Sequence, residues 1–187
     1  IITSLEEVGI KDAETVFNMY PFQLSGGQNQ RIMIAQGIIS KPDLLIADEP
    51  TSAIDASLKK KILELFKKIN QKYNMSIIII THDFSVARYI CDNLIIMYGG
   101  LVVESGTINE ILKSPQHPYT DELIKCAYSL DNYEDTLYSL DGAPPTPYEF
   151  KDECPFYNRC KIKDDVCKEK IPPLVEKDGR KVRCFKR

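Results

Sequence analysis

Short apolar runs alternate with longer stretches of mixed polarity along the first half of this chain. The apolar runs at 44–47 and 76–80 predict buried strands, and the run 93–98 predicts a third. Apolar residues at helical spacing predict one helix at 28–40 and another that ends at about Tyr73. This alternation of strands and helices favours an α/β fold.

Turn signals divide the rest of the chain. Gly99-Gly100 predicts a hairpin between the strand 93–98 and a strand at 101–104. Thr107 is a candidate N-cap for a helix that runs to Lys113. Clustered prolines at 141–147 favour an extended backbone and therefore predict a stiff linker.

A Ser25-Gly26-Gly27 turn is predicted to open the first of the two long helices. The first backbone N–H groups of a helix lack intrahelical partners, and the helix dipole favours an anion at that end. Glycine also lets an anion come close to the backbone. The turn therefore suits a phosphate group, although a Ser-Gly-Gly turn alone is weak evidence for one.

Two acidic residues, Asp48 and Glu49, directly follow the apolar run 44–47. Ligands of open α/β sheets gather at the ends of such strands. Adjacent carboxylates can divide the work there, with Asp48 facing a magnesium ion and Glu49 polarising the water that attacks a terminal phosphate. His82 follows the run 76–80, so it lies beside Glu49 if the two strands are neighbours. Taken alone, this histidine would be interpreted as an ordinary capping or core residue.

These motifs occur in the order shown by the ABC ATPases: signature turn, acidic strand end, aspartate-containing loop and strand-end histidine. The chain resembles that family from about Tyr20 to Thr107. The resemblance implies a P-loop NTPase core that hydrolyses ATP with Mg²⁺. The residues that it places against the γ-phosphate of ATP held by the other subunit of a dimer are Ser25, Gly26, Gly27 and Gln28.

The same resemblance assigns roles to residues beyond the signature turn. Asp48 would serve magnesium, Glu49 would be the catalytic base and His82 the γ-phosphate sensor. Asp55 would lie in the loop that crosses the dimer interface and links the two nucleotide sites. Ile54 stands where the family commonly has leucine, and this volume-conserving change puts little in doubt.

Two family elements are absent from the 187 residues: the Gly-x-x-x-x-Gly-Lys-Ser/Thr phosphate loop and the glutamine loop ahead of the signature. The chain also begins with Ile1, and its first segment already resembles the helical subdomain that leads into Tyr20. We therefore expect an ABC ATPase core lacking its N-terminal part, which does not hydrolyse ATP alone. A naturally shortened regulator is the rival interpretation.

The chain after this core resembles the C-terminal extension of ATPases that serve oligopeptide, dipeptide and nickel importers. The resemblance rests on residues 114–120 with the helix that follows to Leu130, and on 141–147. We expect two domains, with residues 1–114 as the C-terminal portion of the nucleotide-binding domain and 115–187 as the extension. His117 is interpreted as a helix-entry residue rather than a metal ligand.

Four cysteines lie within 31 residues of the extension: Cys154, Cys160, Cys167 and Cys184. A reducing compartment disfavours disulfides, so metal or cluster binding is the preferred interpretation. The spacing lacks the Cys-x-x-Cys knuckles usual for structural zinc. Residues 151–187 carry 12 basic and seven acidic side chains, which would offset thiolate charge. The family resemblance associates such a set with a [4Fe-4S] cluster; zinc, or a solvated basic tail with incidental cysteines, remains an alternative.

The overall composition suits a cytosolic α/β protein. Hydrophobic residues make up 43% of the chain, charged residues 27%, and the formal net charge is −3, so no strong field selects nucleic acid. Apolar runs such as 77–80 are too short to span a bilayer, and no secretory signal pattern begins the chain. We expect a peripheral protein at the cytoplasmic face of the cell membrane, bound there through a partner.

Together these features predict the ATP-hydrolysing subunit of an ABC importer for oligopeptides or dipeptides, with nickel as a further candidate cargo. The implied partners are a second ATPase subunit, identical or related, the transmembrane permease subunits and, indirectly, a substrate-binding protein, but no nucleic acid. One alternative is a soluble ABC ATPase that acts on nucleic acid or ribosomes. Another is a metal-binding or iron-sulfur regulatory module.

Overall fold

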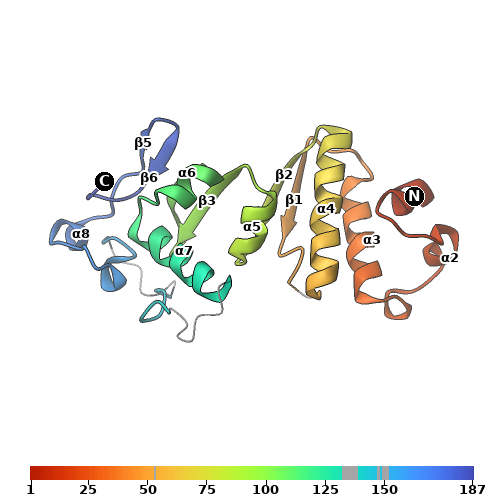
Figure 1. The fold of residues 1–187 in the computed structure, drawn as a ribbon, viewed down its shortest axis with the longest axis horizontal. Helices are drawn as coiled ribbons and strands as arrows, with labels where there is room; N and C mark the ends of the chain where they lie inside the picture. Colours follow the sequence, from red (N-terminus) through yellow and green to blue (C-terminus); the bar gives the residue numbers. More distant parts are fainter. Residues whose placement is uncertain (53, 132–138, 147, 149–151) are drawn as a thin grey trace. The chain divides into compact units, whose positions relative to one another are not determined.

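The computed structural model describes residues 1–52, 54–131, 139–146, 148 and 152–187. Ala53 of the predicted interface loop and Pro147 of the predicted linker lie outside the described residues. The chain divides into two compact units, Ile1–Ile90 and Cys91–Arg187 (Figure 1). The domain boundary expected near residue 114 stays a prediction.

The first unit contains six helical segments and two strands among its described residues. In chain order these are α1 (Ile2–Glu7), α2 (Ala13–Phe17), the 3₁₀ turn η1 (Pro21–Gln23), α3 (Gly26–Ile38), β1 (Leu44–Asp48), α4 (Ala56–Tyr73), β2 (Ser76–Ile80) and α5 (Phe84–Ile90).

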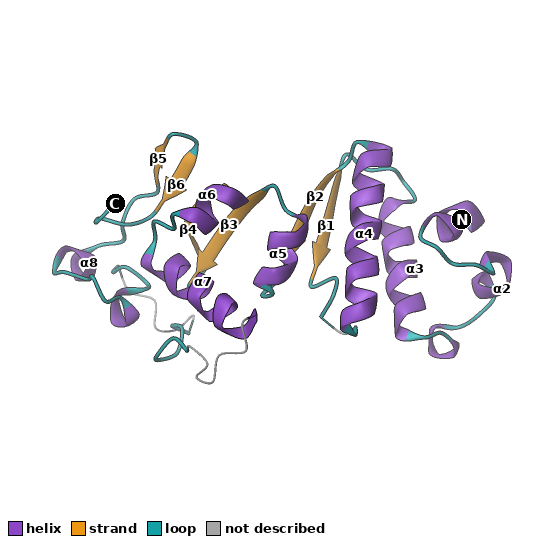
Figure 2. Cartoon of the chain, viewed as in Figure 1, coloured by secondary structure: helices purple, strands orange, loops and turns teal. Residues whose placement is uncertain are grey.

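Strands β1 and β2 pair in parallel, with Leu44 opposite Ser76 and Asp48 opposite Ile80. A parallel pair needs a crossover connection, and α4 provides it. Helices α3 and α4 lie along one side of the strands (Figure 2). The carboxyl ends of both strands therefore meet at one edge, as the sequence predicted.

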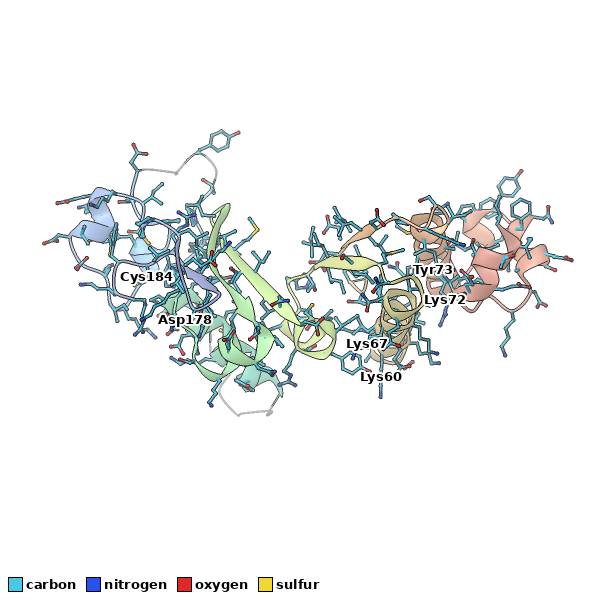
Figure 3. The ribbon with its side chains drawn as sticks, turned by 90° about the horizontal axis from the view of Figure 1, so that it is seen from above. Lys60, Lys67, Lys72, Tyr73, Asp178 and Cys184 are labelled. Atoms are coloured by element: carbon cyan, nitrogen blue, oxygen red, sulfur yellow. The ribbon has the colours of Figure 1, made fainter. Side chains whose placement is uncertain are left out.

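The core of the first unit lies between the strands and the helices. It is built mainly from buried aliphatic residues of the segment 5–16, of α3 and of α4, together with Phe66, and Leu45 and Ile77 of the strands pack against it. Helix α4 contributes because its apolar residues recur at three- and four-residue intervals. Its exposed side carries lysines, among them Lys60 and Lys72 (Figure 3).

The second unit is built around an antiparallel sheet of order β3-β4-β6-β5. Its elements are β3 (Asn93–Tyr98), β4 (Leu101–Thr107), α6 (Ile108–Lys113), α7 (Pro118–Asp131), the 3₁₀ turn η3 (Tyr157–Arg159), α8 (Val166–Glu169), β5 (Val175–Lys177) and β6 (Arg180–Val182). Gly99 and Gly100 both have positive φ and form the predicted hairpin turn. Thr107 caps α6 as predicted, and its side chain accepts from the Glu110 N–H.

Strand β4 runs three residues beyond its predicted end at Glu104 because it pairs on both edges. It continues along β3 to the Asn93–Thr107 pair, and β6 pairs with Glu104 and Ser105 on the other side. The partner strand β6 lies more than 70 residues further along the chain, so no local pattern indicated this extension.

Glu104 is a fully buried carboxylate on β4 of the second unit. It accepts hydrogen bonds from the backbone N–H of Gln116 at 2.9 Å and of His117 at 2.8 Å, and pairs with the Arg180 guanidinium at 2.6 Å. A buried charge needs such partners to offset its lost hydration. Glu104 thereby ties the 116–117 segment and β6 to β4.

His117 lies directly before α7 and is 2% exposed. Its Nδ1 accepts a hydrogen bond from the Tyr119 N–H at 3.1 Å, and its ring packs against Phe156 with centroids 5.7 Å apart. This placement agrees with the predicted helix-entry role. Burial lowers the pKa of His117 to about 4, although the Glu104 charge acts in the opposite direction.

The buried neutral His117 predicts a specific pH dependence of stability. In the unfolded chain the imidazole has its ordinary pKa near 6.5. The stability that neutral His117 contributes to the folded protein is therefore complete above that pH and is lost as the pH falls toward 4. Between pH 7 and pH 5 we expect the free energy of unfolding to fall by about 2 kcal/mol. Urea titrations of the wild type and His117→Gln, which keeps an acceptor, measure this. Equal losses in both proteins would contradict it.

Candidate functional site

The Ser25-Gly26-Gly27 turn opens helix α3 as predicted. Ser25 is the N-cap, and its Oγ accepts from the Gln28 N–H at 3.3 Å. Gln28 Oε1 in turn accepts from the Ser25 N–H at 2.9 Å, which completes a capping box. The two side chains therefore fix the first turn of α3.

The two glycines of this turn differ in the space around them. A Cβ added at Gly26 would meet no heavy atom within 4 Å, whereas one added at Gly27 would lie 2.6 Å from the Leu58 side chain. Gly26 borders open space, and Gly27 lets α3 pack against α4. An open pocket of about 830 Å³ lies here, lined by the turn, by residues 9–12 and by Asp55. The pocket therefore gives an anion room to approach the N-terminus of α3, a position that favours negative charge.

Asp48 and Glu49 lie at the end of β1, where the chain turns sharply. Glu49 has φ of 47°, a left-handed conformation that is uncommon for a residue with a side chain. Its N–H still donates to the Ile80 carbonyl at 2.9 Å, so β1 and β2 stay paired up to this point. The Asp48 residue is exposed and its partner across the pair is Ile80.

His82 lies against Glu49, as its position after β2 predicted. The distance from His82 Nδ1 to Glu49 Oε1 is 2.7 Å, and the His82 backbone N–H donates to the same oxygen at 3.1 Å. A carboxylate can only accept, so Nδ1 carries the shared proton and Nε2 is available to another group. The His82 side chain is 81% exposed and that of Glu49 is 34% exposed, which leaves both accessible to a ligand.

Asp83 anchors the histidine-bearing segment to α4. Its Oδ1 accepts from the Ser85 N–H at 2.9 Å, at the start of α5, and its Oδ2 pairs with Lys59. Burial alone would raise the pKa of Asp83, but the hydrogen bonds and charge of Lys59, together with Ser85, lower it to about 2. The Asp83 carboxylate is therefore ionised at neutral pH, and its contact with Lys59 fixes the segment that carries His82 to α4.

Asp55 is the N-cap of α4. Its Oδ1 accepts from the N–H groups of Ser57 at 2.9 Å and Leu58 at 3.0 Å. These hydrogen bonds, first that of Leu58, lower the pKa of Asp55. The structure thus gives Asp55 a capping role and a place on the pocket beside the signature turn. Its predicted role at a dimer interface stays a prediction.

All eight predicted phosphate-site and catalytic positions lie in the first unit. Glu49 and His82 contact each other, whereas the signature turn approaches α4 through Gly27. Two residues whose side chains join these elements were not singled out by the sequence: Lys59, which pairs with Asp83, and Gln30, which donates to the Pro50 carbonyl. No motif distinguishes either residue from an ordinary helical polar residue.

The four clustered cysteines of the second unit are all free thiols. The Cys154 N–H donates to the Cys167 carbonyl at 2.8 Å, which brings two of them into one local fold. Burial raises the pKa of Cys154 to about 11 and also raises those of Cys160 and Cys167. Within the part of the chain that the structure describes, no three His, Cys, Asp or Glu side chains form a group able to hold a metal ion.

Two family models match this chain. Residues 1–52 match the model described as ABC transporter, and residues 103–167 match the one described as oligopeptide/dipeptide transporter, C-terminal region. The first range includes Glu49 and the signature turn, and the second includes three of the four cysteines but not Cys184.

Curated relatives align along nearly the whole chain. The oligopeptide transport ATP-binding protein AppD of Bacillus subtilis (strain 168) is 43% identical over 97% of this chain and 56% of its own length. The dipeptide transport ATP-binding protein DppD of Escherichia coli (strain K12) is 40% identical over 98% of this chain and 56% of its own length. The chain therefore spans a little over half the length of these relatives.

Solved structures share the fold of part of the chain. The post-hydrolysis dimer of the ATP-binding cassette MJ0796 with ADP and Pi matches with a TM-score of 0.50 and 33% identity, over 57% of this chain and 45% of that one. The ADP conformation of the cassette MJ1267 gives a TM-score of 0.54 over 64% and 47%; at 21% identity it supports the fold alone. Among the described residues, no helix is long and apolar enough to cross a membrane.

Proposed function

The chain belongs to the ABC transporter ATPases and carries the C-terminal region of oligopeptide/dipeptide transporters, and on this premise we propose that it is part of an ATP-hydrolysing subunit of a peptide importer. The observation that carries the proposal is the Glu49–His82 pair at the ends of β1 and β2, in the same unit as the glycine turn of α3. Phosphoryl transfer to water needs both a water-positioning group and donors for phosphate oxygens.

In this proposal Glu49 orients the attacking water and accepts its proton. The Nδ1–H of His82 fixes the carboxylate, and its Nε2 is available for the γ-phosphate. Asp48, exposed at the strand end, is the residue that would hold Mg²⁺. The metal would neutralise charge on the phosphate oxygens.

The signature turn is proposed to act on a nucleotide held by a second ATPase subunit. Its open space at Gly26 suits an incoming phosphate, and the N-terminus of α3 suits its charge. The partner subunit, a second copy or a related chain, would supply the phosphate loop for that nucleotide. ATP would then favour the closed pair, and hydrolysis would release it.

The proposed cargo is an oligopeptide or dipeptide. The support comes from the C-terminal family match and from the relatives AppD and DppD, whose names state oligopeptide and dipeptide transport. Nickel is a further candidate. The proposed setting is the cytoplasmic face of the membrane, against permease subunits that receive cargo from a substrate-binding protein. The comparisons give no support to a nucleic-acid-directed ATPase.

The direct test is ATP hydrolysis by the complete importer in lipid vesicles. We expect the substrate-binding protein loaded with a short peptide to raise hydrolysis severalfold above the rate with the empty binding protein. Nickel-loaded binding protein is the matched comparison. Stimulation by nickel but not by peptide would overturn the proposed cargo, and absence of ATP hydrolysis would overturn the proposed activity.

A [4Fe-4S] cluster at Cys154, Cys160, Cys167 and Cys184, with Zn²⁺ as the alternative, stays a separate proposal. The four thiols as they lie among the described residues do not form a metal-binding group, so no step above depends on one. Iron, acid-labile sulfide and zinc content of anaerobically purified protein, with each cysteine replaced by serine, tests it.

A further inference from the structure

Gln30 links the signature helix to the strand end that carries Glu49. Its side chain lies on α3, one turn beyond the signature glycines, and its Nε2 donates to the Pro50 carbonyl at 2.6 Å. The donor must be the amide nitrogen, because a carbonyl oxygen only accepts. Gln30 and Pro50 lie 20 residues apart in sequence, so this is a tertiary contact in a partly buried place.

The residue next to Pro50 is held in an uncommon conformation. Glu49 has positive φ, its N–H bonds to the Ile80 carbonyl, and its own carbonyl accepts from Ser52 Oγ at 3.1 Å. Residues in sparsely populated backbone regions persist only where their surroundings fix them. The Gln30 hydrogen bond is one of the contacts that fix this turn, and it comes from the signature helix.

The signature helix also contacts helix α4, which follows this turn in the chain. Gly27 approaches Leu58 of α4 so closely that a Cβ there would lie 2.6 Å from the leucine side chain. The start of α3 is itself fixed by the Ser25–Gln28 capping box. A displacement of the signature turn therefore has a packed route to α4 through Gly27 and a hydrogen-bonded route to the Glu49 turn through Gln30.

We propose that Gln30 is a positioning residue that couples the two nucleotide sites of an ATPase pair. The inference rests on the proposed function, in which the signature turn serves the nucleotide of one site and Glu49 serves that of the other. Phosphate bound at the signature turn fixes the position of α3. The Gln30 hydrogen bond then holds the Pro50 carbonyl in place, and with it the preceding residue, Glu49, so that the Glu49 carboxylate can orient the attacking water.

The test replaces Gln30 in the full-length ATPase subunit assembled with its partner. Gln30→Leu keeps a similar size but cannot donate, and we expect kcat for ATP to fall about tenfold with KM unchanged within about twofold, the size of effect that one lost hydrogen bond produces. Gln30→Lys restores a donor and should recover most of kcat. Gln36→Leu, the same change at an exposed position of α3, is the matched control.

A second readout separates positioning from folding. The Tm of each variant is measured, and kcat is expressed per folded subunit. Recovery of kcat by Gln30→Lys supports the inference, because a lost packing role would change Tm and leave the rate per folded subunit intact. Equal kcat for Gln30→Leu and Gln36→Leu, or a raised KM with unchanged kcat, overturns it. A wild-type subunit without ATP hydrolysis overturns the proposed function instead, and the coupling role with it.

Discussion

Glu49→Gln in the full-length subunit is expected to lower the ATP turnover rate by about 10³-fold while ATP binding is retained. Glutamine keeps an oxygen that can accept from His82 Nδ1, 2.7 Å from Glu49 Oε1, so the geometry of the pair is preserved. What is lost is the negative charge that orients water and accepts its proton. The measurement is single-turnover hydrolysis together with equilibrium ATP binding.

A matched control for this change lies in the same unit. Glu64→Gln replaces a half-buried carboxylate of α4 that lies outside the proposed site, and it is expected to leave turnover within about twofold of the wild type. Turnover near the wild-type level in Glu49→Gln would remove Glu49 from the role of general base. A loss of ATP binding would show instead that its charge serves binding.

The second large effect is expected at the signature turn, where stability and activity should separate. The Cβ of Gly26→Asp would meet no heavy atom of another element within 4 Å, so the fold has room where the new side chain begins. A carboxylate in the first turn of α3 also interacts favourably with the helix dipole, by about 0.5 kcal/mol. The same charge repels the phosphate that the proposed function brings there. We expect unchanged or slightly raised Tm and a loss of turnover of at least about 10²-fold.

Gly26→Ala distinguishes charge from volume in this experiment. It adds only a methyl group into the same space, so its turnover should lie between those of the wild type and Gly26→Asp. A folded Gly26→Asp protein with wild-type turnover would show that no phosphate approaches this turn. Destabilisation of Gly26→Asp would show that the space at Gly26 is filled in solution.

The positions of the main site residues could be predicted because each follows from a local pattern. Two short apolar runs become the parallel strands β1 and β2, and residues that follow parallel strands meet at one edge. Once β1 and β2 are neighbours, that rule places His82 beside Glu49. The Ser25 cap is likewise a local feature, because its hydrogen-bond partner is only three residues away.

The contacts that hold these residues could not be predicted because they join distant parts of the chain. Gln30 meets Pro50 across 20 residues, and Lys59 meets Asp83 across 24. In the second unit, Glu104 and Arg180 are 76 residues apart, and their pairing accompanies the unpredicted strand β6. From the sequence alone, a polar helix residue that faces solvent cannot be distinguished from one that binds a carbonyl of another element.

The signature turn and the Glu49 site are proposed to work together in a pair of ATPase subunits. ATP-dependent association of the full-length Glu49→Gln subunit, followed by light scattering, tests that claim directly. We expect dimers with Mg-ATP, monomers with Mg-ADP, and monomers with either nucleotide once Gly26→Asp is added. Monomers of Glu49→Gln in Mg-ATP, or dimers that persist after Gly26→Asp, would contradict it.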